Sequence, residues 1–419
     1  MNRIFTLLLC ITSAFTLSAQ TLCDGQRFVS PVFADQVQET SNVKFGENIQ
    51  PTLGNPNNVQ ELYLTFFDAP TDQATKRPLV ILAFGGAFVF GARQSGDIVS
   101  LCTYLAEHGY ATAAIDYRLT PGLLLGGNPR EGTMAVLKAT HDMKAAVRFF
   151  RADAAGANQF KIDTDHIFIG GVSAGAVAST HAAYLKSLAD LPPYLEASDT
   201  VGIGGIEGLS GSQGFSSEVS GVINLCGAIG DTAWMEAGGA PLISMHGDED
   251  GTVPYATDTV RLFGIDLPLS GSETMDIRAK NLGISSQFYT FTGADHVPFV
   301  SQITGQPVPT YMDTTERFVR DNLVKLVCGP ATSIGRQELL TSRVYPQPMT
   351  DQVMIELPIS THALSLEVRD IQGRNMRIQA ERQVNGFLLH RGTLSAGLYV
   401  FSIKNANNAI VSRGKIQIQ

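Results

Sequence analysis

The first two thirds of the chain alternate between short apolar runs and longer amphipathic stretches. Residues 78–84 and 167–172 are continuously apolar, which is typical of strands covered on both faces of a sheet. Residues 61–68 alternate between apolar and polar positions like an edge strand, whereas residues 97–108 carry apolar side chains at helical spacing. Strands that alternate with helices predict an α/β fold with a mostly parallel sheet.

The same patterns continue to about residue 328. We expect further strands at 110–116, 222–226, 241–245 and 287–291, and further helices at 131–152, from Ala174 onward and at 315–327. The sequence pattern of residues 256–283 predicts a mixture of loop and helix. Residues 189–218 are rich in glycine and contain two prolines, which predicts a long irregular insertion that bounds a binding pocket.

The character of the chain changes after Pro330. Short strands separated by polar turns are expected at 353–357, 365–370, 386–390, 397–403 and 409–417, which predicts a small antiparallel β-sandwich. The charge changes as well, because residues 336–419 hold ten Lys and Arg against six Asp and Glu, whereas residues 20–335 hold 19 against 33. We therefore expect a first domain at 20–329, a linker at 330–342 and a second domain at 343–419.

The N-terminus has the features of an export signal. A positive start, a short apolar core and Ala19 before Gln20 are typical of a secretory signal peptide over residues 1–19. The apolar run is too short to span a bilayer, which argues against a membrane anchor. The net charge of −9 argues against a nucleic-acid partner.

Four cysteines remain after residue 19, and export would permit disulfides among them. Three pairings are possible. Cys23 and Cys328 lie at the two ends of the first domain, so we favour a bridge between them. Cys102, on the apolar face of a predicted helix, and Cys226, at the end of a predicted strand, fit small buried hydrophobic residues.

The chain is organised around one strand-to-helix turn. The apolar run ends in Gly171-Val172-Ser173-Ala174-Gly175 and continues into an Ala-rich helix. A Gly-x-Ser-x-Gly pattern in this setting is typical of a nucleophile elbow with Ser173 at the turn. Side chains at Gly171 or Gly175 would collide with such a tight turn. The alternative is an incidental serine in a glycine-rich turn. The order of the remaining catalytic groups along the chain distinguishes these two interpretations.

A serine hydroxyl needs a base that takes its proton and a carboxylate that orients the base. Three histidines follow Ser173 within the predicted sheet region. His181 lies two turns along the helix, and His246 ends a strand before the acidic loop. His296 follows the last predicted strand, where the base of this kind of fold should lie. We therefore expect His296 to be the base.

The orienting acid is expected in the loop that follows His246, which contains Asp248, Glu249 and Asp250. Asp248 lies early in this loop. Asp250 lies farther out and precedes Gly251, which lets the chain turn back. We predict that Asp250 orients His296 and that Asp248 is solvated or structural.

The stretch Phe84-Gly85-Gly86-Ala87-Phe88 follows a predicted strand, and its small residues let backbone N–H groups approach an oxyanion. With these motifs, residues 60–328 resemble the α/β-hydrolase superfamily, and within it the esterases and lipases with a His-Gly-Gly-Gly oxyanion motif. Asp116-Tyr117-Arg118-Leu119 is similar to a strand-end motif of that group. Phe84 stands where histidine is usual, and Ala87 where the third glycine is usual. The resemblance implies that the N–H groups of Gly86, Ala87 and Ala174 bind the oxyanion.

Residues 343–419 resemble the C-terminal sorting domain of type IX secretion in Bacteroidetes. Four stretches carry the resemblance: 344–348, where Pro346-Gln347-Pro348 replaces the usual Pro-Asn-Pro, 366–374, 394–401 and the final 413–419. The resemblance implies the type IX secretion machinery as a partner. It also implies passage through the outer membrane and release or attachment at the cell surface.

Together these features predict a secreted or cell-surface serine carboxylesterase, or lipase-like hydrolase, that cleaves small-molecule esters through an acyl-enzyme. This chemistry needs no metal and no organic cofactor. Two alternatives stay open. The first is a serine peptidase of the same fold, because a triad alone does not distinguish ester from amide. The second is a non-catalytic surface binding protein on the same scaffold.

Overall fold

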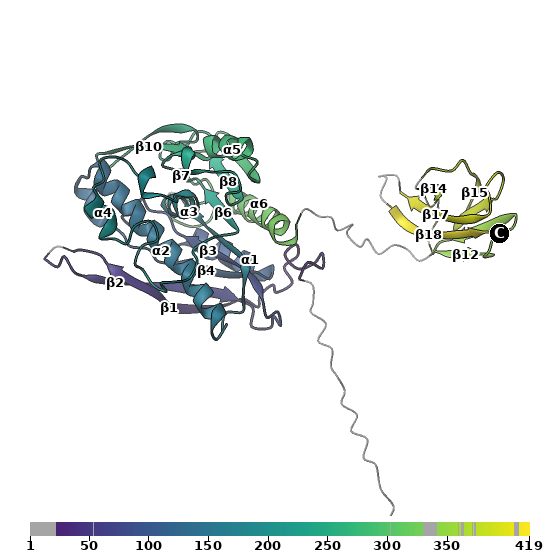
Figure 1. Ribbon diagram of the computed structural model, residues 1–419, viewed down its shortest axis with the longest axis horizontal. Helices are drawn as coiled ribbons and strands as arrows, with labels where there is room; N and C mark the ends of the chain where they lie inside the picture. Colours follow the sequence, from purple (N-terminus) through teal and green to yellow (C-terminus); the bar gives the residue numbers. More distant parts are fainter. Residues whose placement is uncertain are drawn as a thin grey trace, which may run out of the picture. The chain divides into compact units, whose positions relative to one another are not determined.

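The computed structural model describes residues 22–329 except 53 and 302, and residues 342–419 except 359, 362, 363, 371, 373 and 406–409. The chain divides into two compact units, Met1–Pro330 and Ala331–Gln419, which are described separately (Figure 1). The expected signal peptide at 1–19 and nearly all of the expected linker at 330–342 lie outside the described residues. Among the helices of the described residues, none combines the length and apolar character that a membrane span requires.

The first unit is built on an eight-stranded sheet. Its strands, in spatial order, are β1 (Gln38–Ile49), β2 (Val59–Asp68), β4 (Ala111–Ile115), β3 (Arg77–Ala83), β5 (Ile162–Val172), β6 (Gly221–Leu225), β8 (Leu242–Gly247) and β11 (Ser286–Phe291). β2 pairs antiparallel with β1 and β4, and all other neighbours pair parallel. The predicted mostly parallel α/β sheet is thus confirmed. Strand β1 was not predicted, because it lies at the sheet edge and most of its side chains are polar and exposed.

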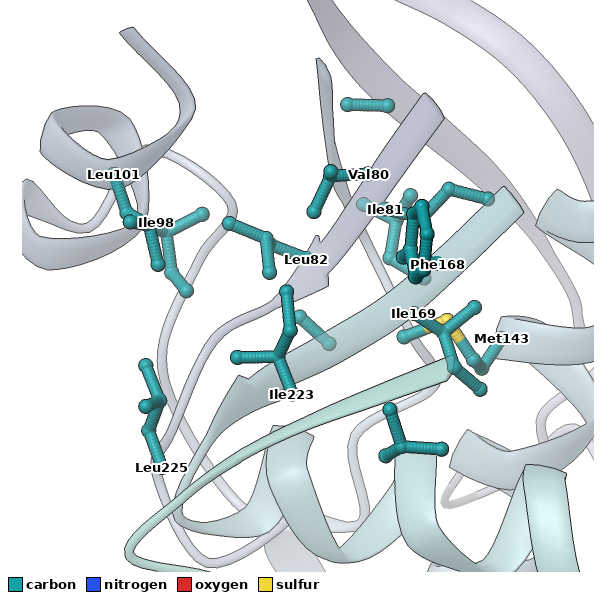
Figure 2. Packing of buried hydrophobic residues seen from close by; sticks show 14 of the residues in the cluster. Val80, Ile81, Leu82, Ile98, Leu101, Met143, Phe168, Ile169, Ile223 and Leu225 are labelled. Atoms are coloured by element: carbon teal, nitrogen blue, oxygen red, sulfur yellow. The ribbon is translucent and has the colours of Figure 1, made fainter. Parts of the chain in front are cut away.

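Helices cover both faces of this sheet, which explains the continuously apolar central strands. On one face Leu82 of β3 lies beside Ile98 of α1, and elsewhere Ile169 of β5 lies beside Met143 of α2 (Figure 2). Helix α6 contacts α1, and α3 contacts α2. The bounds are α1 (Gly96–Glu107), α2 (Pro129–Ala155), α3 (Ala174–Tyr184), α5 (Ser272–Asn281) and α6 (Pro309–Cys328).

Residues 256–283 differ from the predicted mixture of loop and helix, because a β-hairpin precedes α5. Strands β9 (Thr257–Leu262) and β10 (Ile265–Gly271) pair antiparallel, and β10 also pairs with the short β7 (Ala228–Ile229). Phe263 and Gly264 form the turn with φ values of 54° and 77°, the left-handed geometry that tight hairpins favour. The pattern was missed because Pro268 argues against a strand; here it lies within β10.

The insertion at 189–218 is largely irregular, as predicted, and contains one short α-helix, α4 (Ala197–Val201). Short 3₁₀ turns occupy Pro121–Leu125, Leu188–Asp190 and Thr232–Trp234. Buried polar groups fix the insertion to α2. Lys144 and Arg148 both pair with Glu207, and the Ser210 hydroxyl donates to Asp142 over 2.7 Å. These contacts hold the insertion against residues 142–148 of α2.

A disulfide joins Cys23 to Cys328, as the sequence favoured. It links the chain that precedes β1 to the end of α6, across 305 positions of sequence. Cys102 and Cys226 are free and buried, in line with their prediction as small hydrophobic residues.

The second unit contains two antiparallel sheets around one apolar core. One sheet has the order β12 (Arg343–Tyr345), β13 (Gln352–Glu356), β16 (Gly386–His390), β15 (Gln379–Gln383), and the other β14 (Ser365–Asp370), β17 (Gly397–Lys404), β18 (Ile410–Ile418). Ile355 and Leu389 from the first sheet share the core with Phe401 and Ile416 from the second. The predicted β-sandwich is confirmed, with two strands, β12 and β15, beyond those predicted.

Candidate active site

Ser173 lies in a strained turn between β5 and α3. Its φ of 53° and ψ of −116° are rare for a residue with a side chain. A Cβ atom at Gly171 or Gly175 would lie 2.4 or 2.2 Å from the carbonyl oxygen of Ala83. The two glycines therefore let β5 and α3 pack tightly against β3, which is the reason anticipated for them. Ser173 is 9% exposed, so its hydroxyl remains accessible from one side.

The structure brings Ser173, His296 and Asp250 together from three separate loops. His296 Nε2 lies 2.9 Å from Ser173 Oγ, and His296 Nδ1 lies 2.6 Å from Asp250 Oδ2. A carboxylate only accepts hydrogen bonds, so Nδ1 carries the hydrogen and Nε2 accepts from the serine hydroxyl. This tautomer leaves Nε2 able to take the serine proton.

The side chain of Asp250 is fully buried and its carboxylate accepts four hydrogen bonds. Oδ1 accepts from the N–H groups of Thr252 and Val253, each over 2.8 Å, while Oδ2 contacts both His296 and His246. Burial alone would raise the pKa of Asp250, but the hydrogen bonds from the two histidines outweigh it and hold this pKa well below its usual range. The carboxylate is therefore ionised at neutral pH.

His246 was not predicted to touch the acid. Its Nε2 lies 2.9 Å from Asp250 Oδ2 and 3.2 Å from the Val253 carbonyl oxygen, so Nε2 carries a hydrogen. Its Nδ1 lies 2.7 Å from Ser272 Oγ, which in turn accepts from Asn224 Nδ2 over 2.9 Å. His246, Ser272 and Asn224 are all fully buried. The spacing of His246 four positions before Asp250 was the only sequence signal for this network.

Asp248 and Asp295 hold the acid loop and the histidine loop together. Asp248 Oδ1 accepts from the N–H of Gly293 over 2.6 Å. Asp295 Oδ1 accepts from the N–H groups of Gly251 and His296, over 3.0 and 2.7 Å. The contact to Nδ1 of His296 comes from Asp250 Oδ2 at 2.6 Å.

The three expected oxyanion donors lie beside the elbow. Ala87 and Ala174 line the same pocket as Ser173, whereas Gly86 is not among its lining residues. In the described part of the chain, the N–H groups of Gly86, Ala87 and Ala174 donate no backbone hydrogen bond. Gly86 has a φ of 125°, and a Cβ atom there would lie 2.1 Å from the Phe90 carbonyl oxygen, so this position requires glycine.

Phe84 anchors the start of the loop that contains Gly86 and Ala87. Its buried ring stacks on Tyr117 with ring centres 4.3 Å apart and an angle of 20° between the planes. The Tyr117 hydroxyl donates to the Phe84 carbonyl oxygen over 3.0 Å. Ring stacking and this hydrogen bond therefore position the start of the loop that carries Gly86 and Ala87.

An apolar pocket opens beside Ser173. Its walls come from α2, α3, the loop at Ala87 and the β9–β10 hairpin, which supplies Val260, Leu262, Leu267 and Leu269. The carbonyl oxygen of Phe263 accepts from the N–H of Gly127 over 2.9 Å, which ties the hairpin to the loop before α2. The prediction that residues 189–218 bound this pocket is wrong, because none of them lines it. The hairpin occupies that position instead.

Comparison with known proteins gives two family matches. Residues 67–204 match the family model described as BD-FAE, an α/β-hydrolase-type esterase domain. Residues 343–419 match the model described as secretion system C-terminal sorting domain. None of the curated proteins compared with the chain matches it.

Among solved structures, the chain is similar to esterase 2 of Thermogutta terrifontis. The structure of that protein phosphoramylated by tabun is 18% identical with a TM-score of 0.47, and covers 70% of this chain and 95% of its own. The structure phosphorylated by paraoxon is 19% identical with a TM-score of 0.47 and the same coverage. The propionate-bound structure is 19% identical with a TM-score of 0.46, and covers 67% of this chain and 93% of its own.

Proposed function

Because the chain carries an α/β-hydrolase-type BD-FAE domain and a secretion system C-terminal sorting domain, we propose that it is an exported serine esterase. It cleaves small-molecule carboxylic esters through an acyl-enzyme. The observation that carries this proposal is the hydrogen-bonded chain from Ser173 Oγ through His296 to Asp250, with distances of 2.9 and 2.6 Å.

In the proposed acylation step, Ser173 Oγ attacks the ester carbonyl carbon and its proton passes to His296 Nε2. The imidazolium that forms is stabilised by the ionised Asp250 at Nδ1. The tetrahedral intermediate collapses by breaking the bond to the alcohol oxygen, which takes the proton from Nε2. Water then repeats the sequence on the acyl-enzyme and releases the acid.

The negative oxygen of the intermediate needs donors that are not already engaged. Ala87 and Ala174 line the pocket at Ser173, and Gly86 precedes them in the same loop as Ala87. We assign all three N–H groups to the oxyanion. Loss of one such donor raises the barrier by about 3 kcal/mol, or on the order of a hundredfold in rate.

The second unit supports export as part of the proposal. Its sequence matches sorting domains, and it is a separate compact unit. The proposal assigns recognition by the type IX secretion machinery to residues 343–419, and chemistry to the first unit. We further propose that the protein is delivered to the outer side of the outer membrane.

The experiment is active-site labelling combined with ester hydrolysis. A fluorophosphonate should label Ser173 alone, and the protein should hydrolyse p-nitrophenyl butyrate. Ser173→Ala and His296→Ala should reduce turnover by at least about a thousandfold while leaving the melting temperature within a few degrees. Labelling of another serine, or full activity of Ser173→Ala, contradicts the assignment. Faster cleavage of a peptide panel than of esters would favour the peptidase alternative.

A further inference from the structure

The position of the apolar pocket at Ser173 indicates which part of an ester enters it. The leaving alcohol oxygen has to take its proton from His296 Nε2, so the alcohol lies on the side of His296. The pocket is lined by Ser173 and by the two alanines assigned to the oxyanion, Ala87 and Ala174, and His296 is not among its lining residues. With the function proposed above, the pocket therefore receives the acyl group.

The β9–β10 hairpin gives this pocket a continuous apolar wall. Every second residue of β10 lines the pocket, namely Ile265, Leu267 and Leu269, and the side chains between them are exposed. On β9, Val260 lies opposite Leu267 and Leu262 lies opposite Ile265, so the two residues of β9 add a second row. Because successive side chains of a strand point to opposite faces, one whole face of the hairpin belongs to the pocket.

The row on β10 also gives the length of the pocket. A strand rises about 3.3 Å per residue, so the row from Ile265 to Leu269 spans about 13 Å. Leu269 packs against the apolar cluster of Val177 and Val253, which belong to α3 and the acid loop. Ile265 packs in a second cluster with Leu123. Since a C–C bond of about 1.5 Å in an extended zigzag advances roughly 1.25 Å per carbon, the row matches a chain of about ten carbons.

The walls of the pocket offer few partners to a polar acyl group. Among the described residues that line it, none carries a charge, and the side-chain hydroxyl groups are those of Ser173 and Thr252. A carboxylate or hydroxyl of the substrate would lose its hydrogen bonds to water on entering, and this loss costs most for an ionised group. A hydrocarbon chain makes no such bonds and gains free energy in proportion to the apolar area that it buries. The walls therefore select an aliphatic acyl group.

The pocket is closed on the side where α2 meets the hairpin. Gly132 of α2 lines it, and a Cβ atom there would lie 3.0 Å from Ile265 Cγ2 and 3.2 Å from Leu267 Cδ1. The helix backbone and the hairpin side chains are thus so close that even a methyl group would crowd them. The pocket cannot widen on this side without moving the hairpin, which favours a single unbranched chain over a ring.

We propose that the preferred substrates are esters of linear saturated fatty acids of about six to ten carbons, the length that the row on β10 accommodates. The acyl chain lies along the hairpin from Leu269 toward Ile265, with its carbonyl carbon at Ser173. This assignment rests on the proposed esterase function and adds the class of acyl group to it.

The test is a series of p-nitrophenyl esters with the full-length protein. We expect kcat/KM to rise from acetate to a maximum near octanoate, at least about tenfold above acetate, because each added methylene group is buried in an apolar pocket. Two further acyl groups have as many carbons as octanoate: phenylacetate, which contains a ring, and the monoester of octanedioic acid, which ends in a carboxylate. Both should be at least about tenfold poorer than octanoate. A maximum at acetate or phenylacetate overturns the proposal.

Two phenylalanine substitutions on β9 test where the chain lies. Val260→Phe adds a ring to the face that lines the pocket, and should lower the octanoate-to-acetate ratio of kcat/KM at least about tenfold. Arg261→Phe adds the same ring to the exposed face and is the matched control, with a ratio within about twofold of the wild type. An unchanged ratio in Val260→Phe, with acetate still hydrolysed, overturns the placement of the chain along the hairpin.

Binding to Ser173→Ala separates this inference from the proposed function, because it requires no turnover. Isothermal titration calorimetry should show that octanoate binds at least about tenfold tighter than acetate. Octanoate binding without ester hydrolysis by the wild type would support the pocket and contradict the esterase function. Ester hydrolysis without a preference for octanoate would support the esterase function and overturn the acyl assignment. Absence of both binding and hydrolysis overturns both.

Discussion

His246 Nε2 lies 2.9 Å from Asp250 Oδ2, the same oxygen that lies 2.6 Å from His296 Nδ1. One carboxylate oxygen thus joins the expected base to a second, fully buried histidine. Since Ser272 and Asn224 fix the ring of His246 from behind, the carboxylate of Asp250 cannot rotate without breaking several hydrogen bonds. His246 is therefore expected to act on the reaction through Asp250, as a positioning residue.

His246→Phe keeps a ring in place but removes the donor to Asp250. We expect kcat to fall about tenfold or more, because a hydrogen bond to a charged group contributes about 1.5–3 kcal/mol. KM should change less than about twofold, since His246 does not line the pocket at Ser173. Steady-state kinetics on a short ester, together with thermal unfolding, measure this. Ser272→Ala, one contact farther away, is the matched variant and should lose less activity. A rise in KM with unchanged kcat in His246→Phe would contradict the positioning role.

Asp250→Asn should lower kcat by about 10⁴, because the amide favours the wrong tautomer of His296. Asp248→Asn should lower it by less than about tenfold, because the Asp248 side chain only accepts from the N–H of Gly293. Both variants preserve side-chain shape, so the comparison isolates the charge. If Asp248→Asn proves the crippled variant, the two roles must be exchanged.

The β9–β10 hairpin is expected to set acyl preference. Leu262→Ala removes apolar bulk from the wall of the pocket at Ser173 and should raise the decanoate-to-butyrate ratio of kcat/KM about fivefold, since a few methylene groups in an apolar pocket are worth about 1–3 kcal/mol. Leu209→Ala, at an exposed leucine of the 189–218 insertion, should leave the ratio unchanged. An equal decanoate-to-butyrate ratio in Leu262→Ala and Leu209→Ala would mean that the acyl chain does not contact the hairpin.

Glu316 gives the fold a pH dependence of its own. Burial against α1 raises its pKa to about 7, while the Ser100 hydroxyl donates to it over 2.7 Å. The folded protein therefore holds a proton that the unfolded chain has released, and stability falls as the pH rises from about 4.5 to about 7. Glu316→Gln mimics the protonated form.

Over the same window, Glu316→Gln should gain about 2 kcal/mol of unfolding free energy relative to the wild type. Urea unfolding at pH 5 and pH 8 measures the difference between the two proteins. Glu218→Gln, at a side chain exposed on the surface, is the control and should show no such gain. If the unfolding free energies of Glu316→Gln and the wild type change equally between pH 5 and pH 8, Glu316 is not the group that causes the pH dependence.

A chain that ends at Gly329 should fold and keep its ester hydrolysis, because the first unit has its own core and retains both partners of the disulfide. We expect its melting temperature within about 3 °C of that of the whole protein. In the native host the same truncation should abolish appearance outside the cell. Loss of the fold on truncation would show that the first unit depends on residues 330–419.

Local patterns carried most of the fold prediction. The runs at 78–84 and 167–172 are buried on both faces, so their composition alone identifies them as central strands. Ser173 was recognisable because Gly171 and Gly175 flank it in a Gly-x-Ser-x-Gly pattern between a strand and a helix. In both cases the signal lies in neighbouring positions of the sequence.

The parts that were missed depend on partners far away in sequence. Strand β10 contains Pro268, and its role in the pocket follows from packing against α2. His246 ends a strand like many buried residues, and its contact with Ser272 spans 26 positions. The local sequence does not record the packing of β10 on α2 or the contact of His246 with Ser272, whereas the assignment of Asp250 over Asp248 could rest on the turn at Gly251.

The Cys23–Cys328 bond has a mechanical consequence. A pull applied at residues 22 and 329 would be borne by the two sulfur atoms, and the intervening 304 residues would form a closed loop that carries no tension. The sheet, the elbow and the hairpin would be shielded from stretching for as long as the bond is oxidised. Reduction would route the same force through the hydrogen bonds that join the strands, and would make the enzyme fragile under shear.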